Sequence, residues 1–220
     1  MIPFRFFSTH EQLSKAVKQE LIHYIKRPGA LMLSGGSTPY KIYATLKKEE
    51  VTVHPERQFF LSDERYVEEL SPLNNGHNLL PMLTELEATH QFMPVQTALP
   101  IEKAAHLYEQ HLTSFEELDF GLLGIGTDGH TAGLFSIEQA KETNTQVSCT
   151  IPRPDQLNGL SVSASFIQRI QRIILIATGE NKRAILRQLR ENPSSIPAGI
   201  ILKAHSNATV WTDLSEKDIC

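Results

Sequence analysis

The sequence has few cysteines and no block of like charge. Its 220 residues include two cysteines, Cys149 and Cys220, with no C-x-x-C pair. So few cysteines build no disulfide framework, and they fit a reducing compartment. The 21 Lys and Arg residues are dispersed among 25 Asp and Glu residues, so the charge pattern points to neither a nucleic acid nor an anionic membrane as partner.

Long hydrophobic runs are also missing. The N-terminal segment MIPFRFFSTHEQ lacks the apolar core and small-residue cleavage site of a signal peptide, and runs such as 173–177 are strand-sized rather than membrane-spanning. We therefore expect a cytoplasmic protein. With 40% hydrophobic residues the chain can bury a substantial core, and its length suits one domain over 1–220, as a monomer or weak homodimer.

Several familiar chemical motifs are absent. There is no H-E-x-x-H, and His106 and His111 lie five positions apart, which is off the same-face spacing of a helix, so no metal site is expected. The chain has no complete G-x-x-x-x-G-K-S/T or G-x-G-x-x-G pattern, which speaks against a P-loop and a dinucleotide-binding fold. It also has no G-x-S-x-G elbow, which disfavours the usual serine hydrolases.

Helical and strand patterns alternate along the chain. Ser8 and Glu11 form a capping box for an amphipathic helix that stops at Pro28-Gly29. A strand at 30–33 leads through a glycine turn into a helix with Thr38 as N-cap. Further strands are predicted at 58–61, 120–123, 172–177 and 209–212, helices at 75–83, 101–115 and 183–190, and a meandering loop at 138–158 with a short strand near Val147.

This alternation predicts an α/β domain with a mainly parallel sheet. In such a sheet ligands bind at the carboxyl ends of the strands. Polar or glycine-rich segments follow four of the predicted strands: SGGSTP, SDER, GIGTDGH and TGENK. We therefore expect these segments to gather on one rim, although each by itself also fits an ordinary turn or a solvated loop.

The segment LLGIGTDGHTAGLFS holds the most specific chemistry. His130 is the best candidate for a general base, because an imidazole changes charge near neutral pH. Asp128, two residues earlier, could orient the ring or hold a substrate hydroxyl. Gly124, Gly126 and Gly129 would let the backbone turn sharply and approach a ligand closely.

Other segments carry candidate anion-binding groups. Residues 34–38 open a helix, where backbone amides and small hydroxyl side chains favour a phosphate. Arg65 could clamp a carboxylate or phosphate, with the neighbouring acids orienting it, and Lys182 could neutralise a phosphate as a point charge. The predicted substrate- or phosphate-binding residues are Ser34, Gly35, Gly36, Ser37, Thr38, Asp63, Asn75, Gly129 and Lys182.

Taken together and in this order, the four segments resemble the 6-phosphogluconolactonase family. The resemblance implies the Rossmann-like three-layer α/β sandwich shared with glucosamine-6-phosphate deaminases, a phosphosugar lactone as substrate, the oxidative pentose phosphate pathway, and no metal or organic cofactor. It places the catalytic histidine at His130, the family's acid at Asp128, the arginine of the D-E-R segment at Arg65 and the phosphate-binding lysine at Lys182.

The chain departs from the family pattern in three places. Asn74-Asn75 stands where Ser-Asn is usual, and Ser136 stands where a proline follows the Leu-Phe pair. The family's Arg-hydrophobic-Thr-Leu-Thr stretch corresponds to residues 159–163, Gly-Leu-Ser-Val-Ser, so one expected arginine is missing. Arg153 and Arg169 are both candidates to compensate for it.

The resulting hypothesis is hydrolysis of 6-phosphoglucono-1,5-lactone. His130 would take a proton from the attacking water and return it to the ring oxygen as it leaves, while Arg65 or loop amides meet the charge on the carbonyl oxygen. One alternative is a deaminase or isomerase of the glucosamine-6-phosphate type, but those enzymes carry a glutamate in an Asn-Glu-Pro-Gly stretch where this chain has residues 132–136. A second alternative is a non-catalytic phosphosugar sensor.

Overall fold

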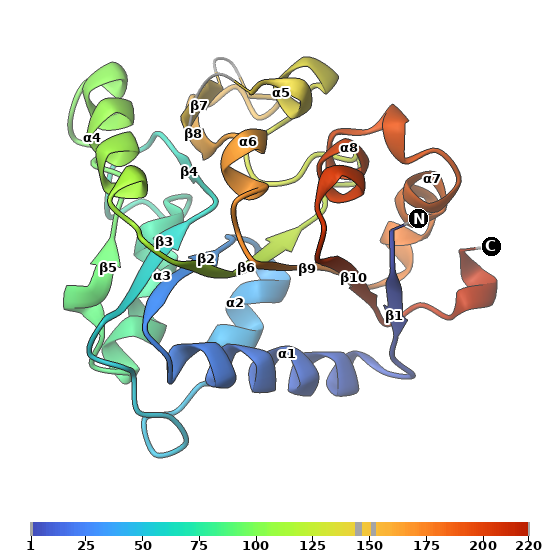
Figure 1. Ribbon diagram of the computed structural model, residues 1–220, viewed down its shortest axis with the longest axis horizontal. Coiled ribbons are helices and arrows are strands. Elements are labelled where there is room, and N and C mark those ends of the chain that lie inside the picture. Colours follow the sequence, from blue (N-terminus) through green and yellow to red (C-terminus); the bar gives the residue numbers. More distant parts are fainter. Residues whose placement is uncertain (1, 144–146, 151–152, 220) are drawn as a thin grey trace.

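A seven-stranded parallel sheet forms the centre of the protein. The computed structural model describes residues 2–143, 147–150 and 153–219 (Figure 1). The strands of the sheet run in the order β1-β10-β9-β6-β2-β3-β5, and every neighbouring pair is parallel. Their bounds are β1 Phe4–Phe6, β2 Gly29–Leu33, β3 Arg57–Leu61, β5 Phe92–Met93, β6 Leu118–Gly124, β9 Arg172–Ala177 and β10 Ala208–Thr212.

Helices cover both faces of this sheet, which gives three layers (Figure 1). On one face lie α1 His10–Ile25, α2 Ser37–Tyr43 and α3 Asn75–Glu85. On the other lie α4 Ile101–Thr113, α6 Ala164–Ile167, α7 Arg183–Glu191 and α8 Pro197–Ala204, with the short α5 Ile137–Lys141 beside them. The predicted α/β sandwich with a mainly parallel sheet is confirmed.

The strand side chains are apolar on both faces because both faces are covered. In β2, Leu31 and Leu33 pack in the core beneath α1 to α3, whereas Ala30 and Met32 belong to the core on the opposite face. This alternation is the two-residue period of a strand, with each side buried as expected of a parallel sheet. The strands therefore form a rigid frame from which the loops at their carboxyl ends project.

A second, antiparallel sheet lies on one side of that frame. Its order is β4-β8-β7, with β4 Asp63–Arg65, β8 Gly159–Val162 and β7 Val147–Thr150. Asp63 pairs with Ser161 and Arg65 with Gly159. The segment predicted as a polar loop after β3 is therefore a strand, because its backbone pairs with a distant part of the chain that local sequence does not reveal. The short strand expected near Val147 is present.

Two helix starts differ from the predicted ones. The side chain of Thr9, rather than Ser8, caps α1 by accepting from the backbone nitrogen of Gln12 at 3.1 Å. Helix α2 begins at Ser37 with Gly36 as N-cap, two residues before the predicted cap at Thr38. Gly36 has a φ of +114°, a conformation that glycine adopts without strain, so the chain can turn into the helix there.

Some elements had no counterpart in the predicted list. Strand β1 adds to the sheet edge beside β10, and α8 follows a short 3₁₀ helix at Pro193–Ser195. The stretch 138–158, expected as a loop with one short strand near Val147, also contains most of α5, and its residues 144–146 and 151–152 lie outside the described part of the chain. Pro197 starts α8 at its first position, where a missing N–H costs nothing.

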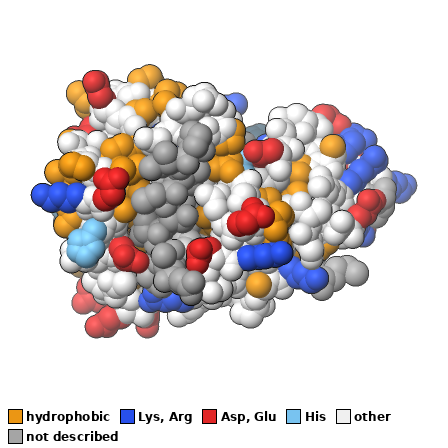
Figure 2. Space-filling view, turned by 90° about the horizontal axis from the view of Figure 1, so that it is seen from above, with side chains coloured by type: hydrophobic (Ala, Val, Ile, Leu, Met, Phe, Trp, Pro, Cys, Tyr) orange, Lys and Arg blue, Asp and Glu red, His pale blue; other side chains and the backbone are white. Residues whose placement is uncertain are grey.

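The surface mixes charges of both signs. On the face seen from above in Figure 2, acidic side chains are scattered throughout, with basic side chains among them. In the part of the chain that the structure describes, no helix has both the length and the apolar character needed to cross a membrane. The longest, α1, has 16 residues.

Candidate active site

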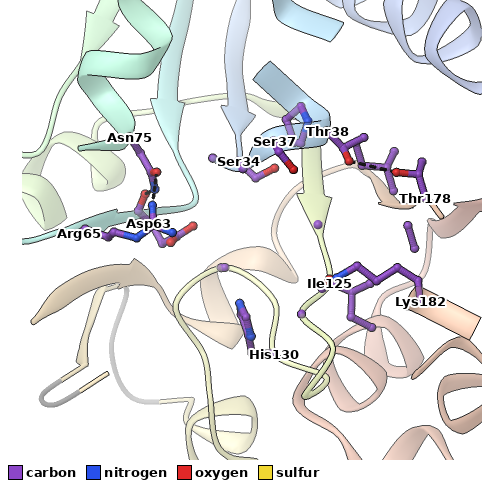
Figure 3. A pocket seen from close by; sticks show the side chains of 18 of the residues that line it. Ser34, Ser37, Thr38, Asp63, Arg65, Asn75, Ile125, His130, Thr178 and Lys182 are labelled. Carbon is purple, nitrogen blue, oxygen red and sulfur yellow. Dashed lines mark hydrogen bonds between the residues drawn. The ribbon is translucent and has the colours of Figure 1, made fainter. Parts of the chain in front are cut away.

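A polar pocket opens at the carboxyl ends of the parallel strands. It is lined by residues that follow β2, β3, β6 and β9, together with the start of α3 (Figure 3). All four segments singled out in the sequence contribute to it, so the prediction that they gather on one rim is confirmed. The predicted site residues that line the pocket are Ser34, Gly35, Gly36, Ser37, Thr38, Asp63, Arg65, Asn75, His130 and Lys182.

His130 is held in place from two sides. Its Nδ1 lies 2.5 Å from Oδ1 of Asp128, and its ring packs on Phe135 with 4.4 Å between the ring centres. Because a carboxylate only accepts hydrogen bonds, in the neutral imidazole Nδ1 carries the proton and the lone pair is on Nε2. The ring is about one-third exposed, and in Figure 3 it lies between Arg65 on one side and Lys182 on the other. Nε2 is therefore available to accept a proton.

The charge of Asp128 suits this role. Burial would raise the pKa of Asp128, but hydrogen bonding to His130 and the charge of that imidazole outweigh burial and lower it. The carboxyl group is thus ionised at neutral pH and stabilises an imidazolium next to it. Asp128 does not line the pocket, so it acts on the imidazole from behind, which supports the ring-orienting role over the substrate-holding one.

Gly126 and Gly129 of this loop must each be glycine, for different structural reasons. A Cβ at Gly126 would lie 2.1 Å from Nδ1 of His130 and 2.3 Å from Oδ1 of Asp128, so the pair fits only over a glycine. Gly129 has a φ of +86°, and a Cβ there would lie 2.7 Å from Ile196. Gly129 was predicted to bind substrate, but the structure packs it against Ile196 and outside the described pocket lining.

Arg65 is positioned by Asn75. The amide oxygen of Asn75 accepts from Nη1 of Arg65 at 3.0 Å and from the hydroxyl of Tyr40 at 2.9 Å, while its Nδ2 donates to the backbone oxygen of Asp63 at 2.9 Å. A Cβ at Gly35 would lie 2.3 Å from the same amide oxygen, so the glycine makes room for it. Asn75 thus fixes the position of the Arg65 guanidinium at the pocket.

Glu64 lies buried beneath these residues. Its carboxyl oxygens accept from the backbone nitrogens of Asn75 at 2.6 Å, Gly76 at 2.7 Å and Arg65 at 2.9 Å. Burial raises the pKa of Glu64 to about 7, although the hydrogen bonds from Asn75 and Gly76 oppose the rise. The side chain therefore joins the start of α3 to β4 and changes charge near neutral pH.

The raised pKa of Glu64 should make the stability of the protein depend on pH. Since the folded pKa of Glu64, about 7, exceeds the ordinary value of 4.5, unfolding releases a proton between these values, and the contribution of Glu64 to stability falls as pH rises through that window. Chemical denaturation of the wild type and Glu64→Gln, at intervals from pH 4.5 to 7.5, measures this. The stability of the wild type relative to the variant should decline with pH; a relative stability that rises with pH would contradict the shift.

Lys182 faces the site from the side opposite Arg65 (Figure 3). It follows β9 in a short 3₁₀ helix, Glu180–Lys182, and its Nζ donates to the backbone oxygen of Ile125 at 2.6 Å. Burial lowers the pKa of Lys182, and the charge of Asp128 opposes this shift. Nearby, the hydroxyls of Thr38 and Thr178 lie 3.0 Å apart, and Oγ of Ser34 is buried without a hydrogen-bond partner. This wall of the pocket presents a cation and several hydroxyls.

Among the lining residues outside the predicted set, two have polar side chains, Thr178 and Arg153. Thr178 follows β9 directly, and only its place at a strand end could have marked it. Arg153 comes from the stretch expected as a meandering loop, where it was one of two arginines proposed to compensate for the missing one. No group of three or more His, Cys, Asp or Glu side chains suited to hold a metal ion occurs among the described residues.

Comparisons with known proteins agree with one another. The family model for glucosamine-6-phosphate isomerases and 6-phosphogluconolactonases matches residues 8–211. The chain is 30% identical to a 6-phosphogluconolactonase of Haemophilus influenzae, covering 93% of this chain and 94% of that protein. It is 29% identical to a glucosamine-6-phosphate deaminase of Corynebacterium kroppenstedtii, covering 93% and 87%. The crystal structure of a 6-phosphogluconolactonase from Thermotoga maritima superposes with a TM-score of 0.81 at 25% identity, covering 96% and 98%.

Proposed function

The chain belongs to the glucosamine-6-phosphate isomerase/6-phosphogluconolactonase family, and from this we propose that it hydrolyses 6-phosphoglucono-1,5-lactone to 6-phosphogluconate. One observation carries the proposal: His130, hydrogen-bonded to Asp128 behind it, lines a pocket that also has cationic side chains on two sides. A base with a free nitrogen and cations for an anionic sugar are the groups that this reaction needs. The curated relatives named as lactonases support the choice of substrate.

His130 acts as the base in this mechanism. Its Nε2 takes a proton from a water molecule while the oxygen of that water attacks the lactone carbonyl carbon. Asp128 stabilises the imidazolium through Nδ1, at 2.5 Å. When the tetrahedral intermediate collapses, the imidazolium returns the proton to the ring oxygen, which leaves as the C5 hydroxyl. The oxygen of the water thus becomes a carboxyl oxygen, and one of its protons reaches the C5 hydroxyl through His130. The other proton is released to solvent when the new carboxyl group ionises.

Two cationic side chains stabilise the negative charges of the substrate, one at the reacting carbonyl and one at the phosphate. Arg65 meets the charge that develops on the carbonyl oxygen, because Asn75 fixes one of its terminal nitrogens at the pocket. Lys182, the hydroxyls of Thr38 and Thr178, and the backbone of residues 34–38 hold the phosphate. Since the phosphate is remote from the reacting carbon, its binding serves to orient the lactone toward His130.

The surroundings of His130 favour the lactonase over the deaminase. Where the deaminases carry a glutamate shortly after the histidine motif, this chain has residues 132–136, and Phe135 packs directly on the imidazole. An apolar ring in that place supplies no second acid or base for sugar ring opening and amine chemistry. Ester hydrolysis needs only the one base.

The test is acid release from freshly generated 6-phosphogluconolactone, followed above the spontaneous rate. We expect strong acceleration by the wild-type protein and no ammonia release from glucosamine 6-phosphate. Ammonia release without lactone hydrolysis would establish the deaminase instead. Absence of both reactions, with a thermal shift on adding 6-phosphogluconate, would establish a phosphosugar sensor.

Replacing Lys182 should separate binding of the phosphate from the chemistry. Lys182→Met keeps most of the apolar stem but removes the cation, so KM for the phosphorylated lactone should rise about 10- to 100-fold, in line with the loss of charged hydrogen bonds. Hydrolysis of unphosphorylated glucono-1,5-lactone should change little. Lys203→Met, at an exposed lysine of α8, is the control. Equal losses with both lactones would contradict a phosphate-binding role.

A further inference from the structure

Arg153 is a buried cation in the wall of the pocket. Its side chain is 5% exposed, and it lines the pocket together with Asp63 and Arg65. Its Nη1 is buried and makes no hydrogen bond, although it lies 3.7 Å from Oδ2 of Asp63, within ion-pair distance. A buried guanidinium nitrogen without a partner is costly, and such a group at a binding pocket is explained by a ligand that completes it.

The rest of the Arg153 side chain is held firmly. Its Nε donates to Asp155, at 3.2 Å from Oδ1, and its guanidinium lies over the ring of Phe135 at 5.0 Å. The backbone helps, because the nitrogen of Arg153 donates to the oxygen of Leu157 at 2.8 Å. Phe135 is also the ring that packs on His130. Arg153 is therefore separated from the catalytic base by one aromatic side chain.

Asp155 connects Arg153 to Arg65. Its Oδ2 lies 3.6 Å from Nε of Arg65, while its Oδ1 accepts from Nε of Arg153. Asp155 itself does not line the pocket, so the carboxylate holds both arginines from behind. The arrangement leaves Nη1 of Arg153 without a hydrogen bond and brings the two guanidinium groups to the same side of the pocket.

The position of Arg153 depends on a glycine at 159. A Cβ at Gly159 would lie 2.9 Å from Cδ and 3.0 Å from Nη1 of Arg153. The arginine thus occupies the volume that any side chain at position 159 would need. Position 159 is where the resemblance described above leads one to expect an arginine. The guanidinium of Arg153 comes from another part of the chain and lies beside this position.

Arg169, the other arginine considered, lies elsewhere. Its guanidinium lies over the ring of Phe166 at 5.3 Å, and it is not among the described residues that line the pocket. Phe166 belongs to α6 and to the core on that face of the sheet. The geometry therefore distinguishes between two candidates that the sequence left equal.

We propose that Arg153 is a substrate-binding residue that donates from Nη1 to an anionic oxygen of the phosphosugar, from the space above Gly159. The oxygen belongs either to the phosphate or to the lactone carbonyl, which gains charge during attack. Asp155 is a positioning residue for this interaction. The inference rests on the proposed function for the identity of the substrate, but the arginine's role is tested by its own variants.

The first experiment compares Arg153→Gln with the wild type on two lactones. Loss of the charged hydrogen bond should lower kcat/KM for 6-phosphogluconolactone about 10- to 100-fold. A higher KM confined to the phosphorylated lactone assigns Arg153 to the phosphate, and a lower kcat with both lactones assigns it to the carbonyl oxygen. Arg169→Gln is the matched control and should behave as the wild type. Unchanged kinetics in Arg153→Gln would overturn the proposal.

Two further measurements separate this proposal from other causes. Arg153→Lys keeps the charge opposite Asp63 and Asp155 but not the planar fork, so it should fold and show an intermediate loss. If Arg153→Gln unfolds, full activity in Arg153→Lys would count against hydrogen bonding by the guanidinium. A wild type without lactonase activity would overturn the proposed function; in that case Arg153→Gln must still weaken 6-phosphogluconate binding, measured by titration calorimetry, for the inference to stand.

Exchanging the two positions tests the shared volume directly. The double variant Arg153→Ala/Gly159→Arg should be at least about 10-fold more active than Arg153→Ala/Gly159→Ala, by recovery of the same charged hydrogen bond. The second variant is the proper reference, because any Cβ at 159 also lies 3.0 Å from the backbone oxygen of Glu64. Equal activity of the two double variants would overturn the claim that both positions serve one site.

Discussion

Replacing His130 with alanine is expected to lower kcat for lactone hydrolysis about 100- to 10,000-fold, the usual contribution of a general base. KM should stay nearly constant, because the groups assigned to substrate binding are the cations on either side of the ring rather than the imidazole. The ring is about one-third exposed, so its removal leaves no large cavity and the variant should fold. Initial rates must be corrected for spontaneous hydrolysis of the lactone.

His90→Ala serves as the control for this variant. His90 is an exposed histidine in the short 3₁₀ helix Thr89–Gln91 and does not line the pocket. It should retain wild-type kcat and KM. If His130→Ala retained more than about a tenth of the wild-type kcat, a base contribution of the usual size would be refuted.

Replacing Asp119 with alanine should cause a large loss of stability, far larger than the loss of an exposed ion pair. Asp119 accepts two hydrogen bonds of 2.8 Å from Arg57, a fully buried residue whose Nη2 also donates to the backbone oxygen of Pro28 at 2.8 Å. Without the carboxylate the guanidinium would be buried and uncompensated. The expected cost is about 3–5 kcal/mol, or a Tm lower by roughly 6–20 °C for a chain of this length.

This loss should leave catalysis intact in the molecules that remain folded. Arg57 begins β3 and Asp119 is near the start of β6, whereas the pocket lies at the opposite, carboxyl ends of the strands. At a temperature well below the lowered Tm, kcat and KM should match the wild type. Glu50→Gln, which removes the partially exposed ion pair with Lys18, should cost less than about 1 kcal/mol in the same denaturation series. Equal effects of the two substitutions would contradict the importance of burial.

Most of the central fold could be predicted from the sequence. Strands such as 172–177 and helices such as 183–190 have strong apolar patterns with clear turn residues between them, and the structure has both nearly as predicted. The elements that were missed are short or lie at an edge. Strand β1 is stabilised by pairing with β10 at the other end of the chain, a contact that no local pattern encodes.

For the candidate site, the sequence predicted the location of the segments but not which of their side chains face the pocket. The polar segments after strands β2, β3, β6 and β9 could be assigned to one rim because parallel strands end at the same edge. Which side chains face the pocket could not be assigned in the same way. Asp128 and Gly129 directly precede His130 in the sequence, yet neither lines the pocket, because the side chain of Asp128 lies behind the imidazole and Gly129 packs against Ile196.

By itself, the sequence determined the α/β class, the rim on which the site lies, and the pairing of an acid with a histidine two residues later. These follow from local periodicity and from chemistry carried within short segments. The tertiary structure alone decided that Asp63–Arg65 is a strand, that Asn75 orients Arg65, and that Arg153 rather than Arg169 reaches the pocket. Each of these depends on contacts between residues far apart in the chain, where packing against a particular neighbour, such as Gly159 beneath Arg153, chooses among arrangements that the sequence leaves equal.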